Sequence, residues 1–341
     1  MAQIQNPAIP QGSLVLVTAA NGYIGSHVAD QLLASGFKVR GTVRDVQKSS
    51  WLAKLLDSKY GSGKFELVAV EEMTAEGAFD EAVKGVSGVI HLASVLTFSP
   101  DPNAVIPPTI AGTLSILKST AKEPAIKRFV YTSSATAVLL PKPNTELTVG
   151  QETFNYEAIE AAWAPPPYTA ERAWAVYAAS KAQAEQEVWK WARDNKEVVV
   201  NTVLPNANFG KLLSPEHQQH RSTTGVVTAM FNGDASFAAM FPPQYYVNVQ
   251  DTAILHVAAL LRSDVANERI YAYAAPFSFN DALAVLRKAY PQRKFPDDIP
   301  DVGKDLTKVP RERAEQLLKD TGRPGWASFE QSIKESVEDL V

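Results

Sequence analysis

A tyrosine and a lysine four residues apart, Tyr177 and Lys181, carry side chains that together could transfer a proton. Free tyrosine has a pKa near ~10, and a neighbouring cation favours its phenolate form, which eases proton transfer at neutral pH. Three Tyr-x-x-x-Lys matches occur in the chain, but only this one lies within an unbroken helical segment, "ERAWAVYAASKAQAEQEVWKWARD". Residues four apart share a helix face. The spacing therefore indicates a proton-transfer pair; the alternative is an amphipathic helix with a core tyrosine and a lysine whose stem covers apolar surface.

Two serines, Ser133 and Ser134, end the strand-like segment "RFVYTSS" that precedes this helix. Ligands of parallel sheets bind at the carboxyl ends of strands, so a hydroxyl there could hydrogen-bond to a substrate carbonyl. Successive side chains of a strand face opposite ways, so we expect only one of the two serines to point into a site.

The stretch "LVLVTAANGYIGSHVADQLLASG", residues 14–36, is typical of a strand, a tight glycine turn and a helix. Gly22 and Gly25 keep the last two positions of a Gly-x-x-Gly-x-x-Gly turn, in which the backbone approaches a pyrophosphate and the helix packs closely on the strand. Helix N–H groups then hold the anion. Ala19 replaces the first glycine, which we expect to require a negative φ or a relaxed turn. The pattern predicts a dinucleotide site; the alternative is a simple connection with incidental glycines.

The second strand-like segment ends in "GTVRD", which places Arg44 where a site for NAD usually has an acidic residue. Lys48 follows one helical turn later. Two cations suit the 2′-phosphate of NADP, and a guanidinium can hold it with two hydrogen bonds. Asp45 would repel a phosphate, but it follows Arg44 rather than replacing it. We therefore predict NADP(H); the alternative is a solvated surface arginine and lysine.

Short apolar segments alternate with helical ones along the 341 residues, which predicts an α/β fold of the Rossmann type, a doubly wound parallel sheet. The strand-like segments begin at Leu14, Lys38, Phe65, Gly88, Arg128 and Val198. Regularity falls at residues 141–173 and again after Pro205, as in functional loops or an added subdomain. A helix pair is expected near the C-terminus, with "RERAEQLLKDTG" as the body of one helix.

Composition excludes several other classes of protein. A net charge of −4 gives no basic face for nucleic acid, and no apolar run approaches the ~20 residues of a membrane helix. The chain has no cysteine, which excludes disulfides and thiolate metal sites and fits a reducing compartment. With an N-terminus unlike a secretory signal, this predicts a cytoplasmic protein. His217 and His220 in "HQQH" have no evident third ligand, so no metal is expected.

Taken together, the motifs make the sequence resemble the extended short-chain dehydrogenase/reductase family, in particular its dihydroflavonol reductase-like branch and the yeast carbonyl and aldehyde reductases that use NADPH. The likeness extends over nearly the whole chain. It is carried by "VTAANGYIGSHV", "VRGTVRD", "GVIHLAS", "KRFVYTSS", "VYAASKAQAE", "NTVLPN", "FPPQYYVNVQD" and "GRPGW".

The resemblance implies the roles of the catalytic residues. Tyr177 would donate a proton to the carbonyl oxygen as hydride arrives from the nicotinamide. Lys181 would favour the phenolate and bond the nicotinamide ribose. The family's pattern selects Ser133 rather than Ser134 as the residue that steadies the developing alkoxide. Ser115 occupies a place often held by an asparagine that supports a proton-relay water, so we leave it out of the catalytic set.

The resemblance also implies the cofactor and substrate contacts. Glu72 stands where aspartate is commoner in the family. The expected cofactor contacts are Ala19, Asn21, Gly22, Tyr23, Ile24, Gly25, Arg44, Lys48, Glu72, Met73, Ala93, Ser94, Val95, Thr132, Tyr177, Lys181, Pro205, Asn206, Asn208 and Ser222. The expected substrate contacts are Phe98, Ser133, Trp174, Phe241 and Gln244. Each wall residue has ordinary core packing as its alternative.

The expected organisation is a NADP-binding Rossmann domain over residues 1–204, with a returning segment near 244–275. Residues 205–341 would form mainly the substrate-binding region. The expected activity is NADPH-dependent reduction of ketones, keto esters or aldehydes. The expected partner is a small carbonyl substrate, with neither nucleic acid nor membrane, in a monomer or homodimer. Two alternatives stay open: a sugar-nucleotide epimerase or dehydratase on the same scaffold, and a non-enzymatic NADP sensor.

Overall fold

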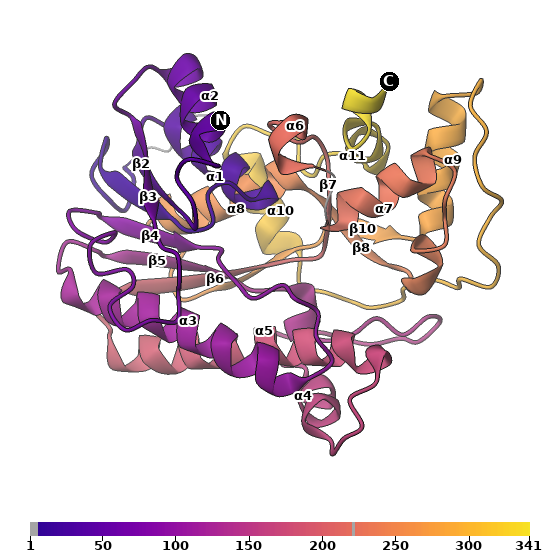
Figure 1. The fold of residues 1–341 in the computed structure, drawn as a ribbon, viewed down its shortest axis with the longest axis horizontal. Helices are drawn as coiled ribbons and strands as arrows, with labels where there is room; N and C mark the ends of the chain where they lie inside the picture. The colour runs from indigo at the N-terminus through magenta and orange to yellow at the C-terminus, as the bar shows by residue number, and fades with distance from the viewer. Residues whose placement is uncertain (1–5, 220–221) are drawn as a thin grey trace.

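A seven-stranded parallel sheet forms the larger part of the molecule (Figure 1). The computed structural model describes residues 6–219 and 222–341. The strand order is β3-β2-β1-β4-β5-β6-β9. The strands are β1 (Leu14–Val17), β2 (Lys38–Val43), β3 (Phe65–Ala69), β4 (Gly88–His91), β5 (Arg128–Thr132), β6 (Val199–Pro205) and β9 (Arg269–Ala272).

Helices cover both faces of this sheet because neighbouring residues of each strand point to opposite sides. In β1, Val15 and Val17 enter the core beneath one helical layer, whereas Leu16 enters the core of the other. The first layer contains α1 (Tyr23–Ala34), α8 (Val249–Leu261) and α10 (Glu312–Asp320), and the second contains α3 (Pro102–Lys122) and α5 (Ala173–Asp194) (Figure 1). Burial on both faces explains the nearly continuous apolar character of the strands.

The predicted α/β class is confirmed. All six strand-like segments are strands of the large sheet, and the "LASG" signal ends α1, with Gly36 at a φ of +83°. The predicted helix around Tyr177 is α5, and the expected C-terminal pair is α10 and α11 (Phe329–Glu335). The other two Tyr-x-x-x-Lys matches start at Tyr60 and Tyr290 and do not lie within a helix: Tyr60 is the last residue of α2 (Ser50–Tyr60), and Tyr290 follows the end of α9 (Phe279–Ala289).

A second, three-stranded sheet organises the C-terminal part, on the right in Figure 1. Its order is β10-β8-β7, with β7 (Ala207–Phe209) parallel to β8 (Gln244–Asn248) and β10 (Ala275–Phe277) antiparallel to it. Helices α7 (Ser222–Phe231), α9 and α11 pack on it through a core rich in phenylalanine. This core is separate from the two cores of the large sheet.

The two segments expected to be irregular contain short elements. The first carries α4 (Tyr156–Trp163), which packs on α5, and a bridge from Thr148 to Lys308. The second carries β7 and α6 (Pro215–Gln218). Among the described residues, no helix is long and apolar enough to cross a membrane.

Candidate active site

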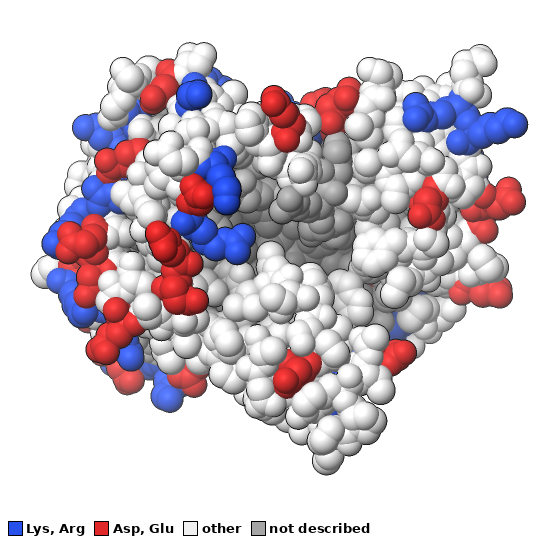
Figure 2. All heavy atoms as spheres, in the orientation of Figure 1, with Lys and Arg blue, Asp and Glu red and all other residues white. Residues whose placement is uncertain are grey.

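The carboxyl ends of β1, β4, β5 and β6 face a hollow between the two parts of the molecule (Figure 2). The chain order reverses at β1, which pairs with β2 on one side and β4 on the other. Ligands of doubly wound sheets bind outside the strand ends at such a switch point. Lys and Arg side chains gather on the rim of the hollow at its N-terminal side (Figure 2).

In the glycine turn, the backbone of Gly22 and Gly25 lies close to the carbonyl group of Ala19. A Cβ on Gly25 would lie 2.3 Å from the Ala19 carbonyl oxygen, and one on Gly22 would lie 3.1 Å from it. The Gly22 N–H donates to the same oxygen over 3.0 Å. Gly22 precedes α1 with no side-chain cap, so the N–H groups of Tyr23, Ile24 and Gly25 begin the helix without intrahelical partners. This cradle of free donors fits a pyrophosphate.

Ala19 corrects the expectation of a negative φ or a relaxed turn. Its φ is +50°, in the left-handed region, and the turn keeps its close contacts. An alanine pays about 1–2 kcal/mol in that region. The contacts of the Ala19 carbonyl with Gly22 and Gly25 enforce this conformation. Ala19 therefore adopts the backbone geometry that a glycine usually has at this position.

A segment far along the chain braces this turn. The Gln218 amide, at the end of α6, donates to Gly22 O (3.2 Å), Asn21 O (3.4 Å) and Ser26 Oγ (2.9 Å). The Asn21 amide donates to Ser49 Oγ over 2.9 Å, and the Tyr23 hydroxyl to Gly210 O over 2.8 Å. The predicted contacts Asn21 and Tyr23 thus have side chains tied to the protein. Sequence reasoning missed Gln218, and no local signal marks it.

The end of β2 carries the predicted 2′-phosphate contacts. Arg44 follows β2 directly and its side chain is exposed. The ammonium of Lys48 instead lies 3.3 Å from Asp45, whose carboxylate also accepts the Lys48 N–H over 3.0 Å. That backbone hydrogen bond is the main reason the pKa of Asp45 is lowered. Of the two predicted cations, Arg44 is therefore the one not engaged with Asp45.

The predicted adenine side, Glu72 and Met73, is held by local contacts. Glu72 accepts hydrogen bonds from the Thr74 N–H (2.9 Å) and hydroxyl (2.7 Å), which lower its pKa. The Met73 side chain packs against Gly112, where a Cβ would lie 3.0 Å from it. Ser115 donates to Ala75 O over 3.0 Å, so its hydroxyl supports this loop.

Ala93, Ser94 and Val95 follow β4, as predicted for residues that line the middle of a cofactor. The Thr18 hydroxyl accepts the Ala93 N–H over 3.0 Å and fixes the path of this segment beside the glycine turn. Among the described residues, Ser94 Oγ is a buried oxygen without a hydrogen-bond partner. An orphaned polar atom at this place fits a bound polar ligand.

Three predicted cofactor contacts, Pro205, Asn206 and Asn208, lie at the end of β6 or just after it. Pro205 ends the strand, and Asn206 Oδ1 accepts the Ala207 N–H over 2.9 Å. The Asn208 amide is used inside the protein, since it accepts from Thr252 (2.6 Å) and donates to Asn206 O (3.0 Å). The Asn208 side chain therefore braces this segment, and its contact with a cofactor stays a prediction.

Ser222, a predicted cofactor contact, begins α7, but the structure does not describe its side chain. His220 lies outside the described residues.

The hydroxyl beside Tyr177 is that of Ser134, which corrects the choice of Ser133. Ser134 is near enough to the Tyr177 phenol to influence its pKa, whereas Ser133 Oγ donates to Glu185 Oε2 over 2.6 Å. The Thr136 N–H (3.2 Å) and hydroxyl (2.9 Å) both donate to Ser134 Oγ. Ser133 and Ser134 face opposite ways, as expected of neighbours, and Ser134 is the one on the side of Tyr177.

Lys181 lies behind Tyr177 and is almost fully buried, with 4% of its surface exposed. Its ammonium donates to Thr132 O over 2.8 Å and lies 5.0 Å from the Tyr131 ring centre. Burial lowers the pKa of Lys181 to about 8, against an opposing effect of Glu185. Burial also raises the pKa of Tyr177, and the hydrogen bond from Ser134 opposes that rise. Thr132 contributes its carbonyl here, because its hydroxyl is bonded to His256.

Aromatic rings surround the Tyr177 phenol. The ring centre of Phe98 lies 4.9 Å from that of Tyr177 and 5.3 Å from that of Trp174, and Trp174 lies 5.4 Å from Phe241. Phe98 is 43% exposed and has a φ of +49°. Gln244 begins β8 and lines a small cavity together with Thr136 and Asn206. The structure thus brings the predicted wall residues to the side of the cleft that Ser134 and Tyr177 occupy.

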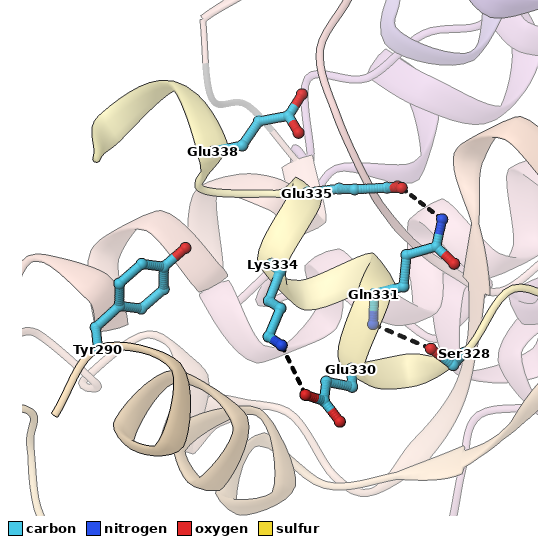
Figure 3. A pocket seen from close by; sticks show the side chains of 7 residues that line it. All are labelled: Tyr290, Ser328, Glu330, Gln331, Lys334, Glu335 and Glu338. Atoms are coloured by element: carbon cyan, nitrogen blue, oxygen red, sulfur yellow. Dashed lines mark hydrogen bonds and ion pairs between the residues drawn. The ribbon is translucent and has the colours of Figure 1, made fainter.

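A groove of about 420 Å³ lies elsewhere, against α11 and the end of α9 (Figure 3). Two of its acidic side chains are paired: Lys334 lies 2.7 Å from Glu330, and Gln331 donates to Glu335 over 2.6 Å. None of the predicted cofactor or substrate residues lines it. In the described ranges, no cluster of three His, Asp or Glu side chains could hold a metal ion.

The chain is similar to known proteins over nearly its whole length. Residues 15–272 match the family model described as "NAD dependent epimerase/dehydratase family". The chain is 45% identical to aldehyde reductase 2 of Sporidiobolus salmonicolor over 99% of its own length and 98% of the relative's. It is 38% identical to a ketoreductase of Penicillium rubens, with 98% of each chain covered. A solved structure of yeast methylglyoxal/isovaleraldehyde reductase with NADPH superposes with a TM-score of 0.79 at 22% identity, covering 96% of this chain and 98% of the other.

Proposed function

The chain belongs to the NAD dependent epimerase/dehydratase family, and on this premise we propose that it reduces the carbonyl group of ketones, keto esters or aldehydes to an alcohol with NADPH. The observation that carries the proposal is the arrangement at the end of β5. There the Tyr177 phenol lies beside Ser134, has Lys181 one helical turn behind it, and faces an aromatic wall. The names of the aldehyde reductase and ketoreductase relatives support the same reaction class.

The residues of this chain would handle the proton. NADPH, when bound, supplies a hydride to the carbonyl carbon. The Tyr177 hydroxyl gives its proton to the carbonyl oxygen, which becomes the alcohol hydroxyl, and the phenol regains a proton from solvent. The Ser134 hydroxyl, beside the phenol, would donate a hydrogen bond to the same oxygen and stabilise its developing negative charge. The Lys181 ammonium would stabilise the phenolate that Tyr177 leaves behind.

The cofactor would lie across the ends of β1, β4 and β5. The glycine turn and the first N–H groups of α1 would hold the pyrophosphate, and Arg44 would hold the 2′-phosphate. Lys48 would contribute less than Arg44, since Asp45 already holds its ammonium. Lys181 has donors left beside the one bonded to Thr132, so it could also reach a ribose hydroxyl.

The aromatic wall favours substrates with an apolar substituent. Phe98, Trp174 and Phe241 would bury an aryl or alkyl group, while Gln244 could orient a polar one. Aryl ketones, keto esters and aldehydes suit such a wall better than sugar nucleotides, whose diphosphates need charged partners. The cytoplasmic location and the monomeric or homodimeric state stay predictions.

The direct test is loss of NADPH absorbance at 340 nm with an aryl ketone, a keto ester and an aldehyde. Tyr177→Phe should lower kcat by about 10²–10⁴-fold, because it removes the proton donor. It should leave NADPH affinity, measured by fluorescence titration, nearly unchanged. Tyr156→Phe is the matched control, since that side chain is 65% exposed at the start of α4, and it should keep full activity.

Three outcomes would contradict all or part of the proposal. Conversion of UDP- or GDP-sugars without net NADPH consumption would favour an epimerase or dehydratase. NADPH binding without turnover of any carbonyl would favour a sensor. Full activity in Tyr177→Phe would remove that residue from the mechanism.

A further inference from the structure

The end of β5 is joined to α5 by three consecutive side-chain links. The Lys181 ammonium donates to the carbonyl of the last strand residue, the Ser133 hydroxyl donates to Glu185, and Ser134 lies beside Tyr177. The pairs are Thr132 with Lys181, Ser133 with Glu185, and Ser134 with Tyr177. The helix partners are spaced four residues apart, so one helix face is matched to the strand end. The link through Ser133 touches neither the phenol nor the ammonium.

Glu185 is the least exposed member of this set, with 0% of its surface accessible. Its Oε2 accepts from Ser133 over 2.6 Å, and its Oε1 accepts from Arg269 (2.8 Å) and Thr202 (3.0 Å). The Trp189 indole donates to Oε1 over 3.1 Å. A buried carboxylate is costly unless it is paired and hydrogen-bonded, and both conditions are met here. The carboxylate thus ties α5 to β5, β6 and β9.

We propose that Glu185 is a positioning residue of the carbonyl-reducing site, which it serves in two ways. Its hydrogen bond from Ser133 fixes the strand end so that Ser134 faces Tyr177. Its charge, one helical turn from Lys181, stabilises the buried ammonium. The inference rests on the proposed function and extends it to a residue that would touch neither substrate nor cofactor.

The surroundings of Lys181 show why its charge needs support. The ionisable groups that face it are Tyr177 and Glu185 on α5, Tyr131 on β5 and His91 on β4. His91 is neutral, because burial and the nearby Lys181 lower its pKa to about 3, and burial raises the pKa of Tyr131 well above its usual value, which keeps that phenol neutral too. Glu185 is the anion in this set, and it opposes the effect of burial on Lys181. Arg269, on β9, forms an ion pair with the same carboxylate. The Glu185 carboxylate therefore lies between two cations, Arg269 and Lys181.

The test compares kcat over a range of pH for three variants, with NADPH and an aryl ketone saturating. Glu185→Gln keeps the shape of the side chain and removes its charge. Lys181 should then lose its proton at lower pH. The alkaline limb of the profile, where kcat falls as pH rises, should therefore shift to lower pH by roughly one pH unit. Glu185→Asp keeps the charge, and its limb should lie close to that of the wild type. Ser133→Ala keeps the ion pair, and it should lower kcat several-fold without moving the limb.

Controls separate positioning from stability. Glu187→Gln removes an acid from the same helix that pairs only loosely, at 3.5 Å, with Lys190, and it should leave the pH profile unchanged. Thermal melting reports the cost of leaving Arg269 without its carboxylate. A lower melting temperature in Glu185→Gln with a wild-type limb would overturn the role of the charge. Unchanged kcat in Ser133→Ala would overturn the role of the anchor, and that variant still decides the question if Glu185→Gln does not fold. Failure of the wild type to reduce any ketone would instead refute the proposed function.

Discussion

The two sides of the cleft around Tyr177 are built by different kinds of interaction. On the polar side, Ser133 and Lys181 are 3% and 4% exposed, and each makes a hydrogen bond of 2.6–2.8 Å to a buried partner. On the aromatic side, Phe98 is 43% exposed and meets its neighbours only through ring contacts. Hydrogen bonds are directional, whereas apolar contacts are not. The polar side therefore fixes where a proton is delivered, and the aromatic side can change shape with the substrate.

Substitutions of the two neighbouring serines should have the largest effects on kcat, and they test whether the polar side fixes the point of proton delivery. Ser134→Ala removes the hydroxyl beside the Tyr177 phenol, and it should lower kcat by about 10²-fold, the usual effect of losing one donor to a developing oxyanion. Ser133→Ala removes only an anchor and should cost several-fold. Steady-state kinetics with one aryl ketone measures both. Equal losses, or a greater loss in Ser133→Ala, would mean that the orientation of the two hydroxyls does not govern the reaction.

Substitution of Arg44 tests whether an exposed side chain can contribute as much to the reaction, through NADPH binding, as the buried polar groups do. Arg44→Gln should raise KM for NADPH by roughly 10–100-fold, the worth of a charge-assisted bidentate contact, while KM for NADH stays nearly constant. Lys48→Gln is the matched comparison and should change KM for NADPH less, because Asp45 already engages that ammonium. The reverse order would assign the 2′-phosphate to Lys48.

The aromatic side should respond more weakly and in a substrate-dependent way. Phe241→Ala removes a ring that packs on Trp174 without touching Tyr177, so KM for an aryl ketone should rise about 10-fold, while KM for a small aldehyde stays nearly unchanged. Phe237→Ala is its control, since that ring packs on Phe241 and is 47% exposed. A similar rise for both substrates would mean that Phe241 supports the fold rather than an apolar substituent.

The features that the sequence predicted correctly follow from local patterns. Six strands, α1 and α5 are visible because apolar period and glycine signals act within a few residues. The small sheet was not visible, because β7 and β10 have three residues each and pair only after distant segments meet. The bracing of the glycine turn by Gln218 has the same origin, since residues almost two hundred positions apart meet there.

Orientation is the second thing that the sequence could not give. The alternation rule states that Ser133 and Ser134 face opposite ways, but it does not say which one faces Tyr177. That choice is made by the buried Glu185, which takes Ser133 to the far side. The serine that lies beside Tyr177 is thus identified by the partner of its neighbour, and that partner lies on another element.

The smallest expected effect is that of Ala19→Gly on stability. It tests whether the glycine turn is held as rigidly as the polar side of the cleft or can change shape as the aromatic side can. Ala19→Gly relieves a left-handed alanine worth about 1–2 kcal/mol but adds about 0.4–1 kcal/mol of unfolded-chain entropy. The free energy of unfolding should therefore rise by at most about 1.6 kcal/mol, seen as a higher urea midpoint at constant slope. Ala20→Gly should act in the opposite direction, because Ala20 is fully buried, lacks a positive φ and packs its methyl group against Gly41. Opposite signs at adjacent alanines would show that the turn is held rigidly in the glycine geometry, since a turn that could relax would have removed the strain at Ala19 already.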